Sequence, residues 1–318
     1  MRILPVKRSE SQLGQALLIV LLVMAVSLTV VLSIASRSIT DISTTKLEEE
    51  SLRAFSAAET AVEDALNNPL IGTHTGTVGD AATEPESAAQ YEVTVSVDAP
   101  SVNPQQFVHP ARPLSGETAT FWFVGHNNSG NISCGGIPCY SGNNTSDFNV
   151  CWGNDGTDPS SSLAPAIELT IYYDPSRQAT IGNFSNVVAE KDVFDPNNVR
   201  RSNNIFEPTS NCGGVSGVSM AFSTGDIEFR SFGNSGIPNG CAAVQGCLLM
   251  ARAKLLYNTS PHLVGISVTD GNLPAQGIQV DATGQAGDST RKVSVYQTYP
   301  EIPPVLDTAV FSLGGLAK

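Results

Sequence analysis

The feature that most constrains this chain is a long uncharged run close to its beginning. No charged side chain falls between Glu10 and Arg37, and residues 16–35 are 20 consecutive apolar or small residues. A helix of that length, rising 1.5 Å per residue, crosses a bilayer hydrocarbon core of about 30 Å. The sequence therefore predicts a transmembrane helix, and a buried helix of a soluble domain is the weaker alternative.

The residues before the run predict its orientation. Arg2, Lys7 and Arg8 precede it, and basic residues favour the cytoplasmic side of a membrane. We therefore expect the N-terminus inside the cell and the rest of the chain outside. A secretory signal cut after Ala35 is the alternative, because "SIA" at residues 33–35 offers small residues for cleavage. The apolar run exceeds the roughly 7–15 residues of such signals, which counts against it.

The helical pattern continues well beyond the apolar run. Residues 37–68 contain neither proline nor glycine, and Pro69 and Gly72 follow them. Apolar residues recur every three or four positions, as on one face of a helix. They are Leu52, Phe55, Ala58, Val62 and Leu66. The sequence thus predicts one helix over residues 16–68, with these five side chains on its buried face.

Two segments carry a resemblance to a known family. Leu13-Gly14-Gln15-Ala16-Leu17, where the basic leader meets the apolar helix, resembles the processing site of a type IV prepilin. Residues 52–66 resemble the membrane-proximal helix of PilX-like minor pilins and pseudopilins. The resemblance implies that prepilin peptidase cuts after Gly14 and leaves Gln15 as the new N-terminus. It also implies a single-pass precursor in the cytoplasmic membrane that later reaches the cell surface or a pilus.

The same resemblance implies partners and a rank within the filament. Other pilin subunits and the lipid bilayer would contact the helix through its apolar side chains, and the first of these are Leu17, Leu18, Ile19, Leu21 and Leu22. Ile19 is the fifth mature residue, where major pilins carry a glutamate that pairs with a neighbour's amino terminus. The missing carboxylate removes a charge pair made in a low dielectric. We therefore expect a minor or initiating subunit.

The chain after residue 68 changes in texture and predicts a β-rich domain. Short runs of alternating apolar and polar residues are separated by Gly, Asn, Ser, Thr and Pro, which is typical of half-buried strands and turns. The expected strands are 91–97, 118–124, 167–173, 248–257, 262–268 and 290–299. Loop signals prevail over 145–162 and 195–217. The order of residues 248–258, 273–284 and 290–312 is also similar to that in the family, whereas 70–246 has no counterpart.

These observations define a fold class and three parts. We expect an α+β protein in which a long N-terminal helix, transmembrane and then amphipathic, carries a mainly antiparallel β domain. The parts are a prepilin-type leader over 1–14, a pilin-like helix over 15–68 with its transmembrane half at 16–35, and a disulfide-containing exported domain over 69–318.

Six cysteines fall in the part expected outside the cell, where an even number indicates disulfides. Six cysteines allow fifteen connectivities. Proximity in sequence suggests the pairs Cys134–Cys139 and Cys241–Cys247, which leaves Cys151 with Cys212. A zinc site is the weaker alternative, because the spacing is irregular and no histidine is close by.

Net charge limits the classes of partner. The formal charge is −13, and removal of a leader with three basic residues and one acidic residue takes it to −15. Binding to a nucleic acid backbone requires clustered Lys and Arg, so we expect no direct contact with nucleic acid. An acidic surface keeps an exported domain soluble.

The motifs that suggest chemistry are weak. Ser43 and Lys46 have the Ser-x-x-Lys spacing of some acylating enzymes, but the companion motifs are missing. Residues 153–162 place Asp155 and Asp158 among turn residues, where calcium binding competes with simple turn formation. The four histidines, His74, His109, His126 and His262, are scattered, and three of them sit beside residues typical of loops. We expect no catalytic residue, no metal and no cofactor.

Two tryptophans complete the candidates. Trp122 and Trp152 suit either core packing or a carbohydrate-binding face, and core packing is favoured. The sequence therefore favours a structural role: a minor pilus subunit, at the tip, that initiates assembly or presents an adhesive surface to an unknown ligand. A membrane-anchored adhesin outside any filament is the alternative, and an envelope hydrolase is a weaker third.

Overall fold

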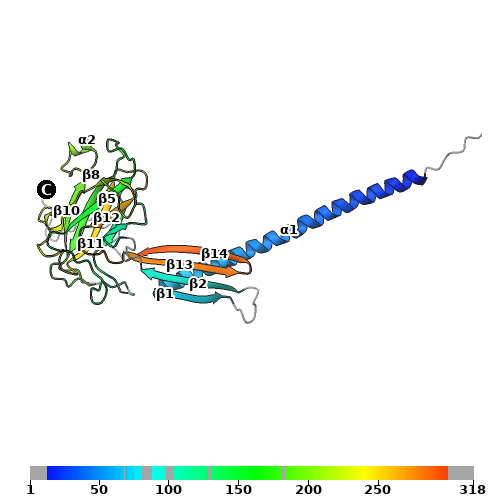
Figure 1. Cartoon of the computed structure of the whole chain (residues 1–318), viewed down its shortest axis with the longest axis horizontal. Coiled ribbons are helices and arrows are strands. Elements are labelled where there is room, and N and C mark those ends of the chain that lie inside the picture. Colours follow the sequence, from blue (N-terminus) through cyan, green and yellow to red (C-terminus); the bar gives the residue numbers. More distant parts are fainter. Residues whose placement is uncertain are drawn as a thin grey trace, which may run out of the picture. The chain divides into compact units, whose positions relative to one another are not determined.

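The computed structural model describes residues 13–67, 69–79, 88–97, 103–127, 130–180 and 183–299. Within these ranges the chain forms one long helix and the strands of three sheets (Figure 1). The chain divides into two compact units. The first contains the helix up to Ala61 with residues 75–92 and 283–293, and the second contains 62–74, 93–282 and the residues from 294 onward. A long apolar helix with a mainly antiparallel β part is the α+β class that the sequence predicts.

Helix α1 spans Leu13–Asn67 and is 55 residues long. At 1.5 Å per residue it measures about 80 Å. It stops just before Pro69, which has no N–H to continue the ladder and restricts the residue before it. The predicted helix over 16–68 is therefore confirmed to within a few residues.

The first sheet has four strands in the order β1 (Gly72–Val78), β2 (Ala89–Val97), β13 (Gly277–Ala286) and β14 (Ser289–Thr298). Figure 1 shows these four strands side by side. Only Gly287 and Asp288 connect β13 to β14. Gly287 has φ +54°, a value that two-residue hairpin turns demand and that glycine adopts at little cost.

The second sheet has six strands. Its order is β3 (Gln106–Val108), β12 (Val264–Val268), β5 (Asp147–Asn154), β9 (Met220–Ser223) and β8 (Ser210–Asn211), with β10 (Ile227–Glu228) also paired to β5. The third sheet has the order β4 (Thr118–Trp122), β11 (Leu248–Leu256), β6 (Ala166–Tyr173) and β7 (Val188–Phe194). Two short helical turns, α2 (Asn198–Arg201) and η1 (Phe229–Ser231), lie in the connections.

The second and third sheets share one hydrophobic core. Phe148, Trp152 and Ile266 of the second sheet and Leu169 and Leu255 of the third belong to the same cluster, and all five side chains are fully buried. Two antiparallel sheets whose inner faces meet in this way form a β-sandwich. The loops of the second unit extend from this sandwich.

The six predicted strands all occur, with ends shifted by at most two residues. The predicted loop over 145–162 is wrong in its first half, because β5 runs through it. Phe148, Val150 and Trp152 occupy alternate positions of β5 and are fully buried. The remaining residues include several that favour turns: Asp147, Asn149, Gly153 and Asn154. Pairing with β12 on one side and β9 on the other overrides that local preference.

Candidate functional site

The apolar half of α1 is the candidate assembly surface. Its first five predicted packing side chains, Leu17, Leu18, Ile19, Leu21 and Leu22, are 59–65% exposed. Large apolar residues remain exposed on all sides of the helix as far as Ile34. The described residues contain one helix that is long and apolar enough to span a membrane. Exposed apolar surface on every side indicates lipid or partner helices as its surroundings.

Two hydroxyls in this half bond within the helix. Ser27 donates its hydroxyl to the carbonyl of Met24 at 2.9 Å, and Thr29 donates to Val26 at 2.7 Å. Intrahelical bonds of this kind allow hydroxyls in an apolar medium.

The predicted processing residues lie at the very start of this helix. Gly14 and Gln15 are in its first turn. Residues 1–12 of the predicted leader lie outside the described residues. Cleavage after Gly14 therefore stays a prediction.

The predicted buried face of the second half of α1 is right for Ala58 and Val62, which are buried, and wrong for Leu52 and Phe55. Leu52 and Phe55 are 69% and 43% exposed, whereas Ala54, Ala57, Ala58 and Ala61 are fully buried. Ala54 and Ala57 pack with Ala89 of β2 and Ala286 of β13. A Cβ at Gly284 of β13 would overlap the carbonyl oxygen of Ala54 and approach the backbone nitrogen of Ala58 at 2.7 Å. Alanine and glycine are used here because the two backbones nearly touch.

The β13–β14 hairpin also forms hydrogen bonds with α1. Glu50, buried in the helix, accepts a hydrogen bond from the backbone of Asp288 at 3.2 Å and pairs with Lys46 at 3.6 Å. Arg291 donates to the hydroxyl of Ser51 at 2.8 Å. The lysine of the Ser43–Lys46 Ser-x-x-Lys sequence therefore forms a helical ion pair with Glu50.

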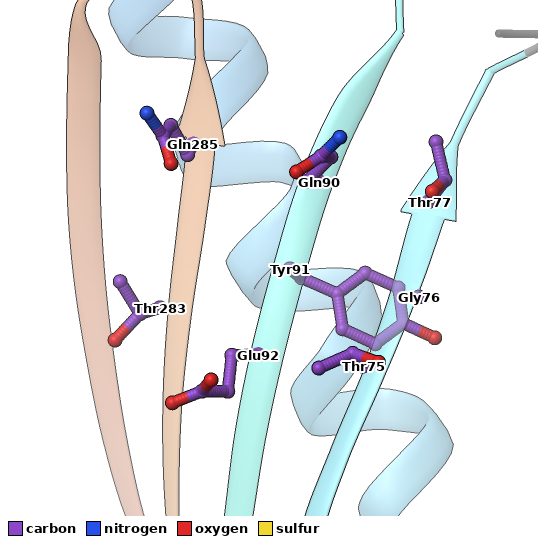
Figure 2. Close-up of a pocket in the computed structure, with 8 residues that line it drawn as sticks. All are labelled: Thr75, Gly76, Thr77, Gln90, Tyr91, Glu92, Thr283 and Gln285. Atoms are coloured by element: carbon purple, nitrogen blue, oxygen red, sulfur yellow. The ribbon is translucent and has the colours of Figure 1, made fainter.

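A shallow polar pocket of about 570 Å³ lies on the first sheet (Figure 2). Figure 2 shows Thr75 and Thr77 of β1, Gln90 and Glu92 of β2, and Thr283 and Gln285 of β13 arranged across three neighbouring strands. Tyr91 extends to Gly76, where any side chain would collide with its ring. This pocket is an open polar sheet surface with one carboxylate.

The six cysteines are paired as sequence proximity suggests. Cα atoms are 5.4 Å apart in Cys134–Cys139, 5.8 Å in Cys151–Cys212 and 5.2 Å in Cys241–Cys247, and no cysteine is free. These separations are ordinary for disulfides. The bridge from Cys151 of β5 to Cys212 closes 61 residues and fixes the segment beside β8 to the central strand.

The structure places both tryptophans in cores. Trp152 is fully buried and donates its indole N–H to the carbonyl of Pro165 at 2.8 Å, and Trp122 is 5% exposed. Neither ring is available to stack on a sugar. The carbohydrate-binding reading of these tryptophans is wrong, and core packing is right.

The histidines are more buried than their loop-like neighbours indicate. His109, His126 and His262 are at most 8% exposed, whereas His74 is exposed. His262 accepts a backbone hydrogen bond from Asn154 at 3.0 Å, and burial lowers its pKa. Burial lowers the pKa of His126 to about 4. Burial thus favours the neutral form of His126 and His262, and His109 packs edge-on against Phe121.

The candidate calcium loop is built as turns. Asp158 accepts hydrogen bonds from the backbone and hydroxyl of Ser160, both at 2.8 Å, and these bonds lower its pKa. Asp155 lines a second pocket, of about 470 Å³, which Arg201 also lines. Among the described residues no group of three or more His, Cys, Asp or Glu side chains is placed to hold a metal ion. Sequence reasoning missed Arg201, because a basic residue in a predicted loop carries no signal of its own.

Comparison with known proteins adds no relative. No family model, no curated protein and no solved structure matches this chain. The pilin resemblance therefore stands on residues 13–17 and 52–66, and less specifically on the last third of the sequence.

Proposed function

We propose that this chain is a structural minor subunit of a type IV pilus or a related filament, located at or near the tip. The apolar half of α1 would hold the precursor in the membrane and later pack against neighbouring helices in the filament core. Both surroundings are similarly apolar, so the transfer need not expose the helix to water. The disulfide-bridged β-sandwich would form the outer surface.

The observation that carries the proposal is apolar surface beyond the membrane span. Ile39, Ile42, Leu47, Leu52 and Phe55 are 43–69% exposed. Arg37, Asp41 and Lys46 are interspersed among them, so this segment does not belong in lipid. An anchored adhesin that never assembles would leave these side chains in water. Neighbouring subunit helices would cover them, as large exposed apolar surfaces usually are covered.

The test introduces one charge on this surface. Leu52 is 69% exposed and contributes nothing to the buried cluster of α1, so Leu52→Glu should leave folding and membrane insertion intact. A charge buried without a partner between helices is costly. We therefore expect incorporation into sheared filaments, measured by quantitative immunoblot against the membrane pool, to fall by more than about tenfold.

Ile205→Glu is the matched control, because Ile205 is 97% exposed in a loop of the sandwich unit. It should leave incorporation unchanged. Equal incorporation of Leu52→Glu and the unmodified chain would contradict packing through this surface. Absence of the unmodified chain from filaments would favour the membrane-anchored adhesin.

A further inference from the structure

Two adjacent arginines of α2 have opposite environments. Arg200 uses four of its five guanidinium N–H donors: it forms two hydrogen bonds to the buried carboxylate of Asp195, at 2.8 and 2.6 Å, and donates to the carbonyls of Ser162 and Ala164. It also lies 4.4 Å from the ring centre of Tyr257. Arg200 is thus a structural group.

Arg201 has none of these partners. Its Nε is buried and has no hydrogen-bond partner, and no ion pair to its guanidinium occurs among the described residues. A buried donor without a partner is expensive and rare in folded proteins. The two terminal nitrogens of its guanidinium are not buried, and no hydrogen bond to them occurs among the described residues. Arg201 lines the 470 Å³ pocket, so a bound ligand can accept hydrogen bonds from these terminal nitrogens. A volume of that size is typical of small-molecule sites.

The rest of the pocket is chemically specific. Asp155, Thr209 and Asn211 line it, and the described residues offer their side chains no hydrogen bond. Met220 and Phe222 also border the pocket, but they are at most 4% exposed and offer a ligand little apolar surface. The pocket therefore presents one cation and several hydroxyl-binding groups.

Three restraints hold the pocket walls in place. The Asp195–Arg200 pair fixes α2 to residues 162–164. Asn197 donates to the carbonyls of Ser160 and Ser161, both at 3.0 Å, which joins α2 to the loop over 153–162. The Cys151–Cys212 bridge fixes the opposite wall. A wall that is already ordered lowers the entropy lost on binding.

We propose that this pocket binds an acidic sugar residue, a pyranose that carries a carboxylate. The carboxylate accepts two hydrogen bonds from Arg201, the geometry that guanidinium favours. The sugar hydroxyls bond to Asp155, Thr209 and Asn211. Arg201 would repel a metal cation, and a neutral sugar would leave the Arg201 donor unpaired. The inference goes beyond the proposed function and holds whether or not the chain enters a filament.

The test uses the full chain in detergent micelles with D-glucuronate and D-glucose as probes. Ligand-observed NMR titration at pH 7 should give saturable binding of glucuronate at least about tenfold tighter than that of glucose. Arg201→Gln should weaken glucuronate binding by about tenfold or more, because one charge-assisted pair is lost. Arg112→Gln removes the same charge at an exposed position of the same unit and should leave binding unchanged.

Thermal unfolding distinguishes a binding role of Arg201 from a structural one. Arg201→Gln should not lower the melting temperature, because the described residues give its guanidinium no partner to lose. Equal binding of glucose and glucuronate would overturn the proposal. So would unchanged glucuronate binding in Arg201→Gln, or no saturable binding of glucuronate to the unmodified chain.

Discussion

His126 is held between two aromatic rings in the sandwich unit. Its ring stacks on Tyr299 with centroids 3.9 Å apart and meets Trp122 edge-on at 4.4 Å. Its Nδ1 is buried without a hydrogen-bond partner, and burial lowers its pKa to about 4. A neutral imidazole here is an aromatic packing group, and protonation would place a charge in an apolar stack.

This burial predicts a pH-dependent stability. The folded pKa is about 4 against an ordinary 6.5, so below pH 6.5 the unfolded chain binds a proton that the folded chain does not. The contribution of His126 is therefore fully present above pH 6.5 and is lost as the pH falls to about 4. A shift of this size corresponds to about 3 kcal/mol. Denaturant unfolding of the full chain in detergent, followed by tryptophan fluorescence, measures it.

His126→Phe keeps the stacking and removes the titration. The difference in unfolding free energy between the unmodified chain and His126→Phe should change by about 3 kcal/mol between pH 7 and pH 4. Other groups titrate equally in both proteins and cancel in the difference. A constant difference across that range would show that the folded chain accepts the proton on His126 without penalty.

At the scale of elements, α1 can pack closely on the first sheet because the residues that face each other are glycine and alanine. Gly284 of β13 faces the backbone of Ala54 and Ala58, and the fully buried residues of this part of the helix are alanines. Adding one methyl group to a closely packed interface typically costs about 1–3 kcal/mol. Gly284→Ala should lower the stability of the first unit by about that amount.

Hydrogen exchange followed by mass spectrometry resolves the effect within the chain. In Gly284→Ala, amides of residues 50–61 and of β13 should exchange faster, since these segments separate together. Gly135→Ala is the control, because no atom lies within 4 Å of a Cβ there. Unchanged exchange over residues 50–61 in Gly284→Ala would mean that the interface accommodates the added methyl group with no loss of stability.

The same interface explains what the sequence predicted and what it did not. Apolar residues at intervals of three to four correctly predict a helix. They also place Leu52 and Phe55 on its buried face, and these two residues are exposed. Which face is buried depends on Gly284, some 230 positions away, and no local pattern carries that information. The strand β5 was missed for a similar reason, because its neighbours β12 and β9 come from distant segments.

The candidate pocket shows a different limit of sequence reasoning. Residues 153–162 were recognised as a polar loop with ligand-type side chains, and Asp155 does line a pocket. The ligand chemistry is nevertheless set by Arg201, which the loop signals over 195–217 did not distinguish from Arg200. Only the contacts separate the two arginines: Arg200 has an acidic partner, whereas no described residue gives Arg201 one.

At the scale of the whole molecule, the prediction concerns rank within a filament. By the pilin resemblance, Ile19 stands where a bulk pilin requires glutamate, and the part that we propose is exported, residues 69–318, has roughly 250 residues. A β domain of that size repeated at every helical step would crowd its neighbours, whereas at a tip it meets no subunit above it. Deleting the chain should reduce the number of filaments or abolish their adhesion without changing the composition of the shaft.

Immunogold labelling of intact cells measures the position directly, and antibodies against the sandwich unit should mark filament ends. The control is Gly14→Val, which should block cleavage before Gln15, keep the precursor in the membrane and abolish label on filaments. Mass spectrometry of the unmodified chain should then find Gln15 at its N-terminus, whereas Ser36 would indicate a secretory signal. Continuous label along the shaft would mean a bulk subunit. Label on the cell body alone would mean that the exposed apolar residues beyond the span remain uncovered by any neighbour, which is the expectation for an anchored adhesin.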